Sequence, residues 1–177
     1  MSAFPKTKSF GFSLVELMVG IVIVGILVTL AMPSFQDVLR NSEVRNAAES
    51  ITNGLQRARA EAVARNAKVQ FVLGTGSSWT VDYVVKPIAT DPPIDSRSSN
   101  EGSKNVTVNA LAADLSTAAT TIAFSNLGGV VTDAASLTQI DLAAPGASQN
   151  LRVTIGVGGN ARMCDPSLVS GSSPRAC

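Results

Sequence analysis

The stretch KSFGFSLVELMVGIVIVGILVTLAMP, residues 8–33, decides the fold. From Phe12 to Met32 it is an apolar run that holds a single acidic residue, Glu16. At about 1.5 Å per residue, a helix of this length measures roughly 30 Å, which is the thickness of the hydrocarbon core of a bilayer. The sequence therefore predicts an N-terminal helix that can cross a membrane.

The flanks of this run predict an orientation. Lys6 and Lys8 precede it, and no acidic residue occurs before Glu16. The positive-inside rule then places the basic flank in the cytoplasm and exports the rest of the chain. Two cysteines, Cys164 and Cys177, lie near the C-terminus and suit an oxidising compartment. Both observations favour a protein with one membrane span and an exported C-terminal domain.

The site of signal cleavage determines whether the run stays on the mature protein. An ordinary secretory signal is cut after its apolar run, and residues 31–33, Ala-Met-Pro, match that signal poorly. Cleavage after Gly11 would instead leave Phe12 as the new N-terminus. Glu16 would then lie one helical turn from the new α-amino group, where it could pair with this ammonium or with that of a neighbouring chain. Because a carboxylate in lipid costs on the order of a few kcal/mol, we interpret Glu16 as functional rather than incidental.

The quoted stretch, with the two residues that follow it, resembles the class III signal and N-terminal helix of type IV pilins and type II secretion pseudopilins. The resemblance implies that a prepilin peptidase cuts after Gly11 and that Phe12 is then N-methylated. It also implies that Glu16 matches the glutamate implicated in docking and register between subunits. The expected partners are other major and minor pilin subunits, the prepilin peptidase and the inner membrane, with assembly into a pilus or pseudopilus at the cell surface.

Composition fits one domain with an appendage and excludes several classes of function. The 177 residues are 45% hydrophobic and 15% charged, which leaves ample apolar material for a core. A formal net charge of +1 predicts no overall attraction to nucleic acid, so such binding would need a local patch. The sequence has no histidine, the commonest general base and metal ligand. It has no phosphate-binding glycine loop and no carboxylate pair at a useful spacing, although four aspartates are available in the exported region: Asp82, Asp91, Asp95 and Asp141. We therefore predict a protein that is not an enzyme and has no cofactor or metal.

After Pro33 the apolar residues become periodic. They step by four and three along one stripe of an amphipathic helix, which we expect to continue to about Asn66: Val44, Ala48, Ile51, Leu55, Ala58 and Ala62. The predicted organisation is a leader at 1–11, a hydrophobic transmembrane and assembly helix at 12–33, an amphipathic helix at 34–66 and a β-rich domain with a C-terminal disulfide loop at 67–177.

From Lys68 onward the pattern is that of strands. Short β-branched or alternating runs are separated by Gly, Ser, Asn, Asp and Pro, and they lie at 68–73, 78–85, 104–111, 120–125, 129–133, 138–143, 151–157 and 159–164. They predict one antiparallel sheet, or two packed sheets, over the helix. The fold class is α+β, with a long N-terminal transmembrane and amphipathic helix packed on an antiparallel β-sheet domain, as in pilins.

Two features of the β region leave alternatives open. The Pro-, Ser- and charge-rich segment from Ile88 to Ser103 is interpreted as an exposed loop, either functional or a disordered connection. Trp79 and Tyr83 fall on one face of a predicted strand, where they either pack on the helix or form a binding patch.

The chain ends in GGNARMCDPSLVSGSSPRAC. The segment between Cys164 and Cys177 has no core of its own, and closing a loop of that size contributes about 3 kcal/mol in the chain-entropy model. We predict that the disulfide forms. A redox switch is the alternative, although the spacing is not CxxC and export favours permanent oxidation.

This tail resembles the GspH/FimT-like branch of the pilin family, also represented by FimU-like minor pilins. Some members bind DNA through a Gly-Arg-x-Arg motif beside the first cysteine; here Gly159 and Arg162 match, but Asn160 replaces the first arginine. A missing cation weakens contacts with phosphates. If the disulfide folds the tail back, Arg152, Arg162 and Arg175 could still converge and bind duplex DNA, the alternative being unrelated solvated arginines.

The resemblance implies a minor type IV pilin in a priming or tip complex of the pilus, with links to twitching motility, adhesion and DNA uptake. One alternative is a type II secretion pseudopilin of the GspH type. Another is a DNA-binding minor pilin for natural transformation.

Overall fold

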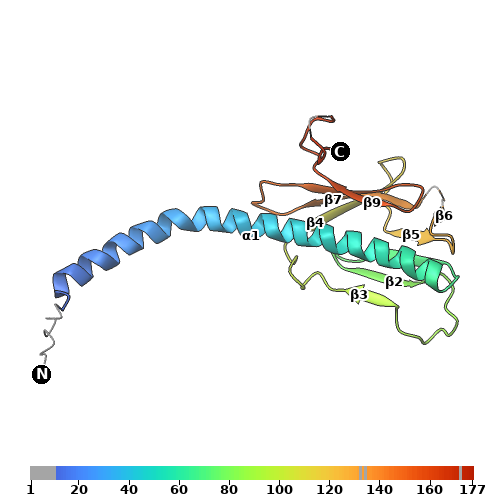
Figure 1. Ribbon diagram of the computed structural model, residues 1–177, viewed down its shortest axis with the longest axis horizontal. Coiled ribbons are helices and arrows are strands. Elements are labelled where there is room, and N and C mark those ends of the chain that lie inside the picture. Colours follow the sequence, from blue (N-terminus) through green and yellow to red (C-terminus); the bar gives the residue numbers. More distant parts are fainter. Residues whose placement is uncertain (1–10, 132, 134, 172) are drawn as a thin grey trace, which may run out of the picture. The chain divides into compact units, whose positions relative to one another are not determined.

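The computed structural model describes residues 11–131, 133, 135–171 and 173–177 (Figure 1). The predicted leader therefore lies outside the described residues, except for Gly11. Contacts within the chain divide it into two units, one ending at Gln36 and the other running from Asp37 to Cys177. A single long helix, α1 (Leu14–Ala64), contributes to both units.

Local signals fix both ends of α1. At the start, Ser13 caps the helix through its hydroxyl oxygen. At the end, Asn66 adopts the left-handed conformation with φ of 49°, and the amides of Asn66 and Ala67 donate to the carbonyls of Val63 and Ala62. These two bonds form a Schellman motif, in which asparagine tolerates the positive φ. The helix therefore ends two residues before the predicted end at Asn66.

The first unit contains the apolar segment of α1. Among the described residues, no single helix is long and apolar enough to qualify as a membrane span. The two parts of α1 on either side of a bend, Leu14–Leu30 and Phe35–Ala64, meet the criterion only when they are taken together.

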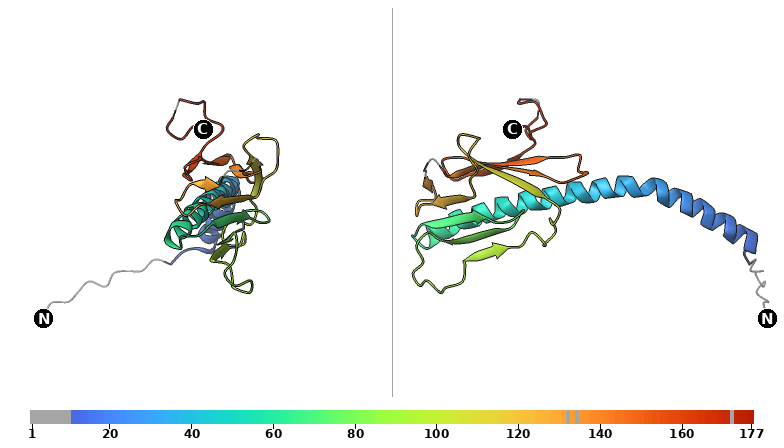
Figure 2. Two further views of the ribbon diagram at one scale, coloured as in Figure 1. Left: turned by 90° about the vertical axis from the view of Figure 1, so that its right-hand side faces the viewer. Right: turned by 180° about the vertical axis from the view of Figure 1, so that it is seen from behind.

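The second unit contains two antiparallel sheets (Figure 1). The first has the order β3-β2-β1-β5-β6 and the second the order β4-β7-β8-β9. The strands of the first sheet are β1 (Val69–Leu73), β2 (Trp79–Tyr83), β3 (Asp95–Arg97), β5 (Thr121–Phe124) and β6 (Val130–Val131). Those of the second are β4 (Thr107–Ala112), β7 (Leu137–Ala143), β8 (Leu151–Ile155) and β9 (Ala161–Cys164). Figures 1 and 2 show the green strands of the first sheet and the red strands of the second on different sides of the C-terminal half of α1.

The core lies between this half of α1 and the two sheets. All six residues of the predicted apolar stripe are buried, from Val44 to Ala62. They meet alternate strand residues such as Phe71, Val81 and Ile140, each of them fully buried. A helix stripe with a period near 3.6 and strand faces with a period of two thus meet in one apolar cluster. The fold-class prediction is confirmed.

One strand was not predicted. β3 lies inside the segment from Ile88 to Ser103, which the sequence predicts to be a loop throughout, and it pairs antiparallel with β2 along Trp79↔Arg97 to Val81↔Asp95. Its sequence, Asp-Ser-Arg, has no apolar alternation, so the pattern gave no strand signal. An ion pair from Arg97 to Glu101 and one from Arg57 on α1 to Asp95 accompany the ladder.

Trp79 packs into the core rather than forming a binding patch. Its indole N–H donates to the Ser50 hydroxyl oxygen on α1 at 2.8 Å, and its ring lies 5.9 Å from that of Phe71. Tyr83 is half-buried, and its hydroxyl oxygen accepts a hydrogen bond from Arg65 at 2.7 Å. Both aromatics therefore join β2 to the helix.

Candidate functional site

The helix start combines a cap with a carboxylate. The backbone N–H of Glu16 donates to the Ser13 hydroxyl oxygen at 3.2 Å, and the N–H of Leu17 donates to the Ser13 carbonyl at 3.2 Å. This is the Ser-x-x-Glu spacing of a capping box, which satisfies amides that the first helical turn leaves free. Glu16 is thus the third helical residue, where the positive end of the helix dipole favours a carboxylate. Sequence reasoning missed Ser13, although the Ser-x-x-Glu pattern could have revealed it.

The segment that follows presents apolar side chains all round. From Phe12 to Met32, the large apolar side chains are between 49% and 84% exposed, at Val28 and Phe12 respectively. Burying one such side chain is worth about 1.5–3 kcal/mol. A helix that is apolar on every face is stable only when lipid or other helices surround it.

The C-terminal loop is closed as predicted. Cys164 and Cys177 form a disulfide, with their Cα atoms 5.1 Å apart. Inside the loop, Asp165 and Ala176 form a parallel bridge, and the Asp165 amide donates to the Arg175 carbonyl at 2.7 Å. The loop therefore folds back on the end of β9.

Arg162 holds this loop in place. One of its guanidinium nitrogens donates to the carbonyl of Pro174 at 3.1 Å and to that of Ala176 at 2.9 Å. Because β9 carries Arg162 and the two carbonyls lie near the chain end, the side chain links the sheet to the last residues. A charge-assisted hydrogen bond of this kind is stronger than one between neutral groups.

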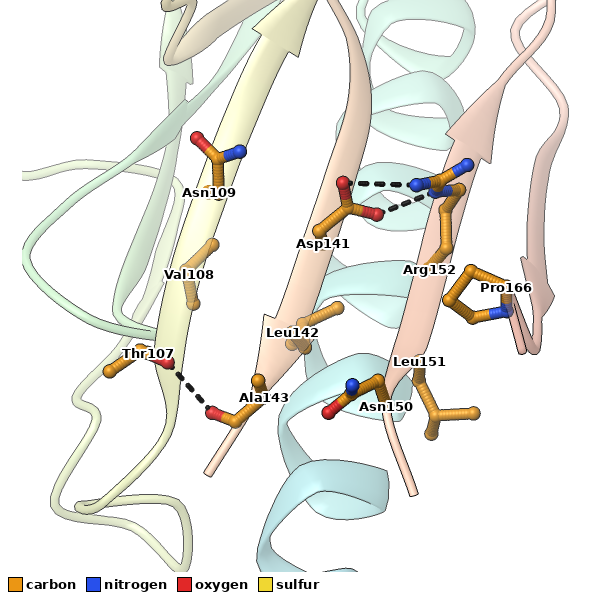
Figure 3. A pocket seen from close by; sticks show the side chains of 10 residues that line it. All are labelled: Thr107, Val108, Asn109, Asp141, Leu142, Ala143, Asn150, Leu151, Arg152 and Pro166. Atoms are coloured by element: carbon orange, nitrogen blue, oxygen red, sulfur yellow. Dashed lines mark hydrogen bonds and ion pairs between the residues drawn. The ribbon is translucent and has the colours of Figure 1, made fainter. Parts of the chain in front are cut away.

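Arg152 lies elsewhere, in a groove of about 340 Å³ on the second sheet (Figure 3). Its guanidinium binds the Asp141 carboxylate through two hydrogen bonds of 2.5 and 3.2 Å across the β7–β8 pair. Figure 3 shows this pair above Ala143, with Pro166 of the C-terminal loop beside it. Of the described residues that line the groove, the only acid, Asp141, is already paired with the only base, Arg152.

Arg175 lies at a different cleft, shared with Arg45 of α1. The three predicted arginines therefore lie in three different places. Arg162 contacts the end of the chain, Arg152 lies in the groove and Arg175 lies at this cleft. Of the three, Arg152 and Arg162 use their guanidinium groups for contacts within the protein.

Carboxyl groups with shifted pKa values lie in turns. Hydrogen bonds from the hydroxyl and amide of Ser167, together with the charge of Arg175, lower the pKa of Asp165. Hydrogen bonds from Thr117 and Ser116 lower the pKa of Asp114 far below its usual value. Both groups stay ionised, so neither can act as a general acid near neutral pH. Within the described residues, no group of three or more metal-ligating side chains occurs.

Comparisons with known proteins agree with this architecture. The model of the Type II transport protein GspH family matches residues 47–159, well over half of the chain. The chain belongs to the GspH family. The prokaryotic N-terminal methylation motif matches residues 6–32 as well, which covers Gly11, Phe12 and Glu16. No curated protein matches the chain.

The fold of this GspH-family chain is similar to those of two solved structures. It resembles the type IV minor pilin FimU of Pseudomonas aeruginosa with a TM-score of 0.50 and 19% identity, over 76% of this chain and 95% of that one. It also resembles the minor pseudopilin EpsH of the Vibrio cholerae type 2 secretion system with a TM-score of 0.50 and 15% identity, over 71% of this chain and 99% of that one. The chain thus has the minor pilin and pseudopilin fold.

Proposed function

We propose that the protein is a structural subunit that enters a pilus or pseudopilus through its N-terminal helix, as a minor pilin of a priming or tip complex. The observation that carries this proposal is the continuity of α1. One helix runs from an apolar segment exposed on every face into the stripe that forms the core of the β unit. The same element can therefore insert among other apolar helices and carry a folded domain with it.

Processing follows from the position of the motif. We propose cleavage after Gly11 and methylation of Phe12, which would put a new α-amino group two residues before the first residue of α1. Glu16 would then lie within the first helical turn, near both the amino group and the helix dipole. The segment at 12–33 would lie in the inner membrane before assembly, the helix would continue to the β domain, and that domain would be periplasmic.

Two assembly systems fit this fold. EpsH belongs to a secretion system and FimU to a pilus, and both share the fold to the same extent. The disulfide closes the C-terminal loop. By the resemblance of this tail to the GspH/FimT-like branch, it favours the pilus member. The competing assignment is a type II secretion pseudopilin of the GspH type.

The experiment compares Glu16→Ala with Ser13→Ala in the host. Because Glu16→Ala keeps the backbone N–H that Ser13 caps, it removes the carboxylate and leaves the cap. We expect its incorporation into sheared filaments to fall about tenfold or more, which corresponds to about 1.4 kcal/mol or more of lost docking energy. Ser13→Ala removes the cap and keeps the carboxylate, so it should reduce incorporation less.

Immunoblots of membrane and filament fractions provide the readout. Gly11→Val should leave an uncleaved precursor in the membrane fraction. Twitching and secretion of an exported enzyme, both measured in a deletion strain, distinguish pilus from secretion system. Normal filament incorporation of Glu16→Ala would contradict the docking role of the carboxylate.

A further inference from the structure

A small cleft lies between α1, the second sheet and the C-terminal loop. Its volume is about 80 Å³, room for a few atoms rather than for a ring system. Arg45 contributes to it from α1 and Arg175 from the disulfide-closed loop. Leu151 of β8 and Met163 of β9 supply apolar wall.

These two arginines differ from the others in that, among the described residues, no close ion pair or hydrogen bond engages their guanidinium groups. The remaining arginines form ion pairs or donate to backbone carbonyls: Arg40, Arg57, Arg59, Arg65, Arg97, Arg152 and Arg162. Within the described part of the chain, neither Arg45 nor Arg175 has an ion pair within 4.0 Å or a hydrogen bond from its guanidinium. The two arginines whose guanidinium groups are not hydrogen-bonded therefore line the same cleft.

One acid, Asp165, also lines the cleft. Its Oδ1 already accepts hydrogen bonds from the Ser167 amide at 2.9 Å and the Ser167 hydroxyl at 2.6 Å. Its single negative charge faces two positive charges, so the cleft keeps a net charge of +1. An incoming anion would complete the charge balance, and guanidinium groups offer paired N–H donors for an oxyanion.

The backbone at Arg175 is held in place before any ligand arrives. Its carbonyl accepts from the Asp165 amide, and the carbonyls on either side of it, those of Pro174 and Ala176, accept from Arg162. Cys177, which follows Ala176, is bonded to Cys164. The loop backbone that carries Arg175 therefore needs little further ordering when a ligand binds.

We propose that this cleft binds a carboxylate carried on a hydrocarbon stem, such as a glutamate side chain presented by a neighbouring pilin subunit. The choice of partner rests on the proposed assembly function, whereas the chemistry of the cleft does not. Leu151 and Met163 favour the stem because they offer apolar surface beside the two cations. A nucleic-acid phosphate would leave this apolar wall uncovered.

The test titrates the full chain in a nonionic detergent with butyrate, formate and inorganic phosphate at constant ionic strength. Arginine Nε–H resonances in NMR spectra report each guanidinium separately. We expect butyrate to shift those of Arg45 and Arg175 with saturation, and to bind several-fold more tightly than formate because its stem covers the apolar wall. Phosphate should bind more weakly than butyrate.

Variants provide the controls. Arg45→Gln and Arg175→Gln should each weaken butyrate binding about tenfold, as expected for a lost charged hydrogen bond. Arg97→Gln, which removes an arginine paired with Glu101 on the first sheet, should leave binding unchanged. Butyrate binding that survives the double variant Arg45→Gln, Arg175→Gln would overturn the site.

Two further outcomes separate the cleft from its proposed partner. If phosphate binds more tightly than butyrate and duplex DNA shifts the same resonances, the ligand is nucleic acid and the carboxylate proposal is wrong. If butyrate binds as expected but the double variant enters filaments like the wild type, the neighbouring subunit is not the partner. The Glu16→Ala experiment tests the assembly function itself, so its failure is distinguishable from failure of this site.

Discussion

Gly54 is the point of closest approach between helix and sheet. A Cβ atom at this position would lie 2.8 Å from Phe71 Cε2 and 2.9 Å from two ring atoms of Trp79. Glycine lowers helix propensity by about 1 kcal/mol relative to alanine, so its presence inside α1 is explained by packing. The two aromatic rings occupy the space that a side chain would need.

Gly54→Ala should therefore destabilise the protein although it improves helix propensity. We expect a net loss of roughly 1–3 kcal/mol, because overpacking forces Trp79 or Phe71 to move. Urea unfolding of the full chain in detergent, followed by fluorescence of the single tryptophan, measures it. Asn53→Ala, at the exposed neighbouring position, should cost little. Equal midpoints for the two variants would refute this packing argument.

At the residue scale, the sequence indicated which residues matter better than it indicated which side chains they contact. The positions of Glu16, Cys164 and Cys177 follow from local spacing, and the structure joins the two cysteines as expected. The partners of Arg152 and Arg162 depend instead on strand register and on the path of the loop. Asp141 faces Arg152 only because β7 pairs with β8, which no local pattern specifies.

At the scale of elements, Arg162 and Arg59 play comparable roles, which we call latches: each is a side chain on a regular element that donates to a backbone carbonyl of a loop. Arg162 donates to carbonyls near the chain end, and Arg59 of α1 donates through Nε to the Gly128 carbonyl at 3.0 Å. Each ties a loop to a regular element. The two latches lie on different elements, so each can serve as the control for the other.

Arg162→Ala should loosen the C-terminal loop without opening the disulfide. We expect amide exchange at Asp165, whose N–H donates to the Arg175 carbonyl, to accelerate about tenfold or more, since roughly 1.5–3 kcal/mol of charged hydrogen bonding is lost. Arg59→Ala should instead accelerate exchange around Gly128. Hydrogen exchange read by NMR measures both, and unchanged exchange at Asp165 in Arg162→Ala would contradict the latch.

The elements themselves were largely predictable. The helical stripe and most strands follow from hydrophobic period, because each buries one face against the core. β3 escaped prediction because it is held by backbone pairing with β2 and by the ion pair of Asp95 with Arg57 of α1, not by buried apolar side chains.

At the scale of the whole molecule, the second unit contains all the buried hydrophobic residues of the described chain, beginning at Val44. A polypeptide of residues 37–177 should therefore fold without detergent. Its boundary must precede Asn41, whose amide group binds the Ser148 hydroxyl and the backbone amides of Ser148 and Gln149.

We expect residues 37–177 to unfold cooperatively and residues 42–177 to be less stable by about 1–3 kcal/mol, because the shorter chain loses these three hydrogen bonds. Urea unfolding monitored by tryptophan fluorescence and circular dichroism compares the two. Equal midpoints would show that Asn41 contributes nothing, and a non-cooperative transition in the longer chain would show that the second unit needs the first.

The continuity of α1 also has a mechanical consequence. A pull applied through the helix at Asp37 acts along the helix axis, parallel to the stripe from Val44 to Ala62 that is packed between the sheets. The contacts along that stripe are then loaded in shear, all at once, rather than peeled apart one after another. If the protein is assembled through its N-terminal helix as proposed, tension transmitted along α1 is therefore carried by all of these contacts together.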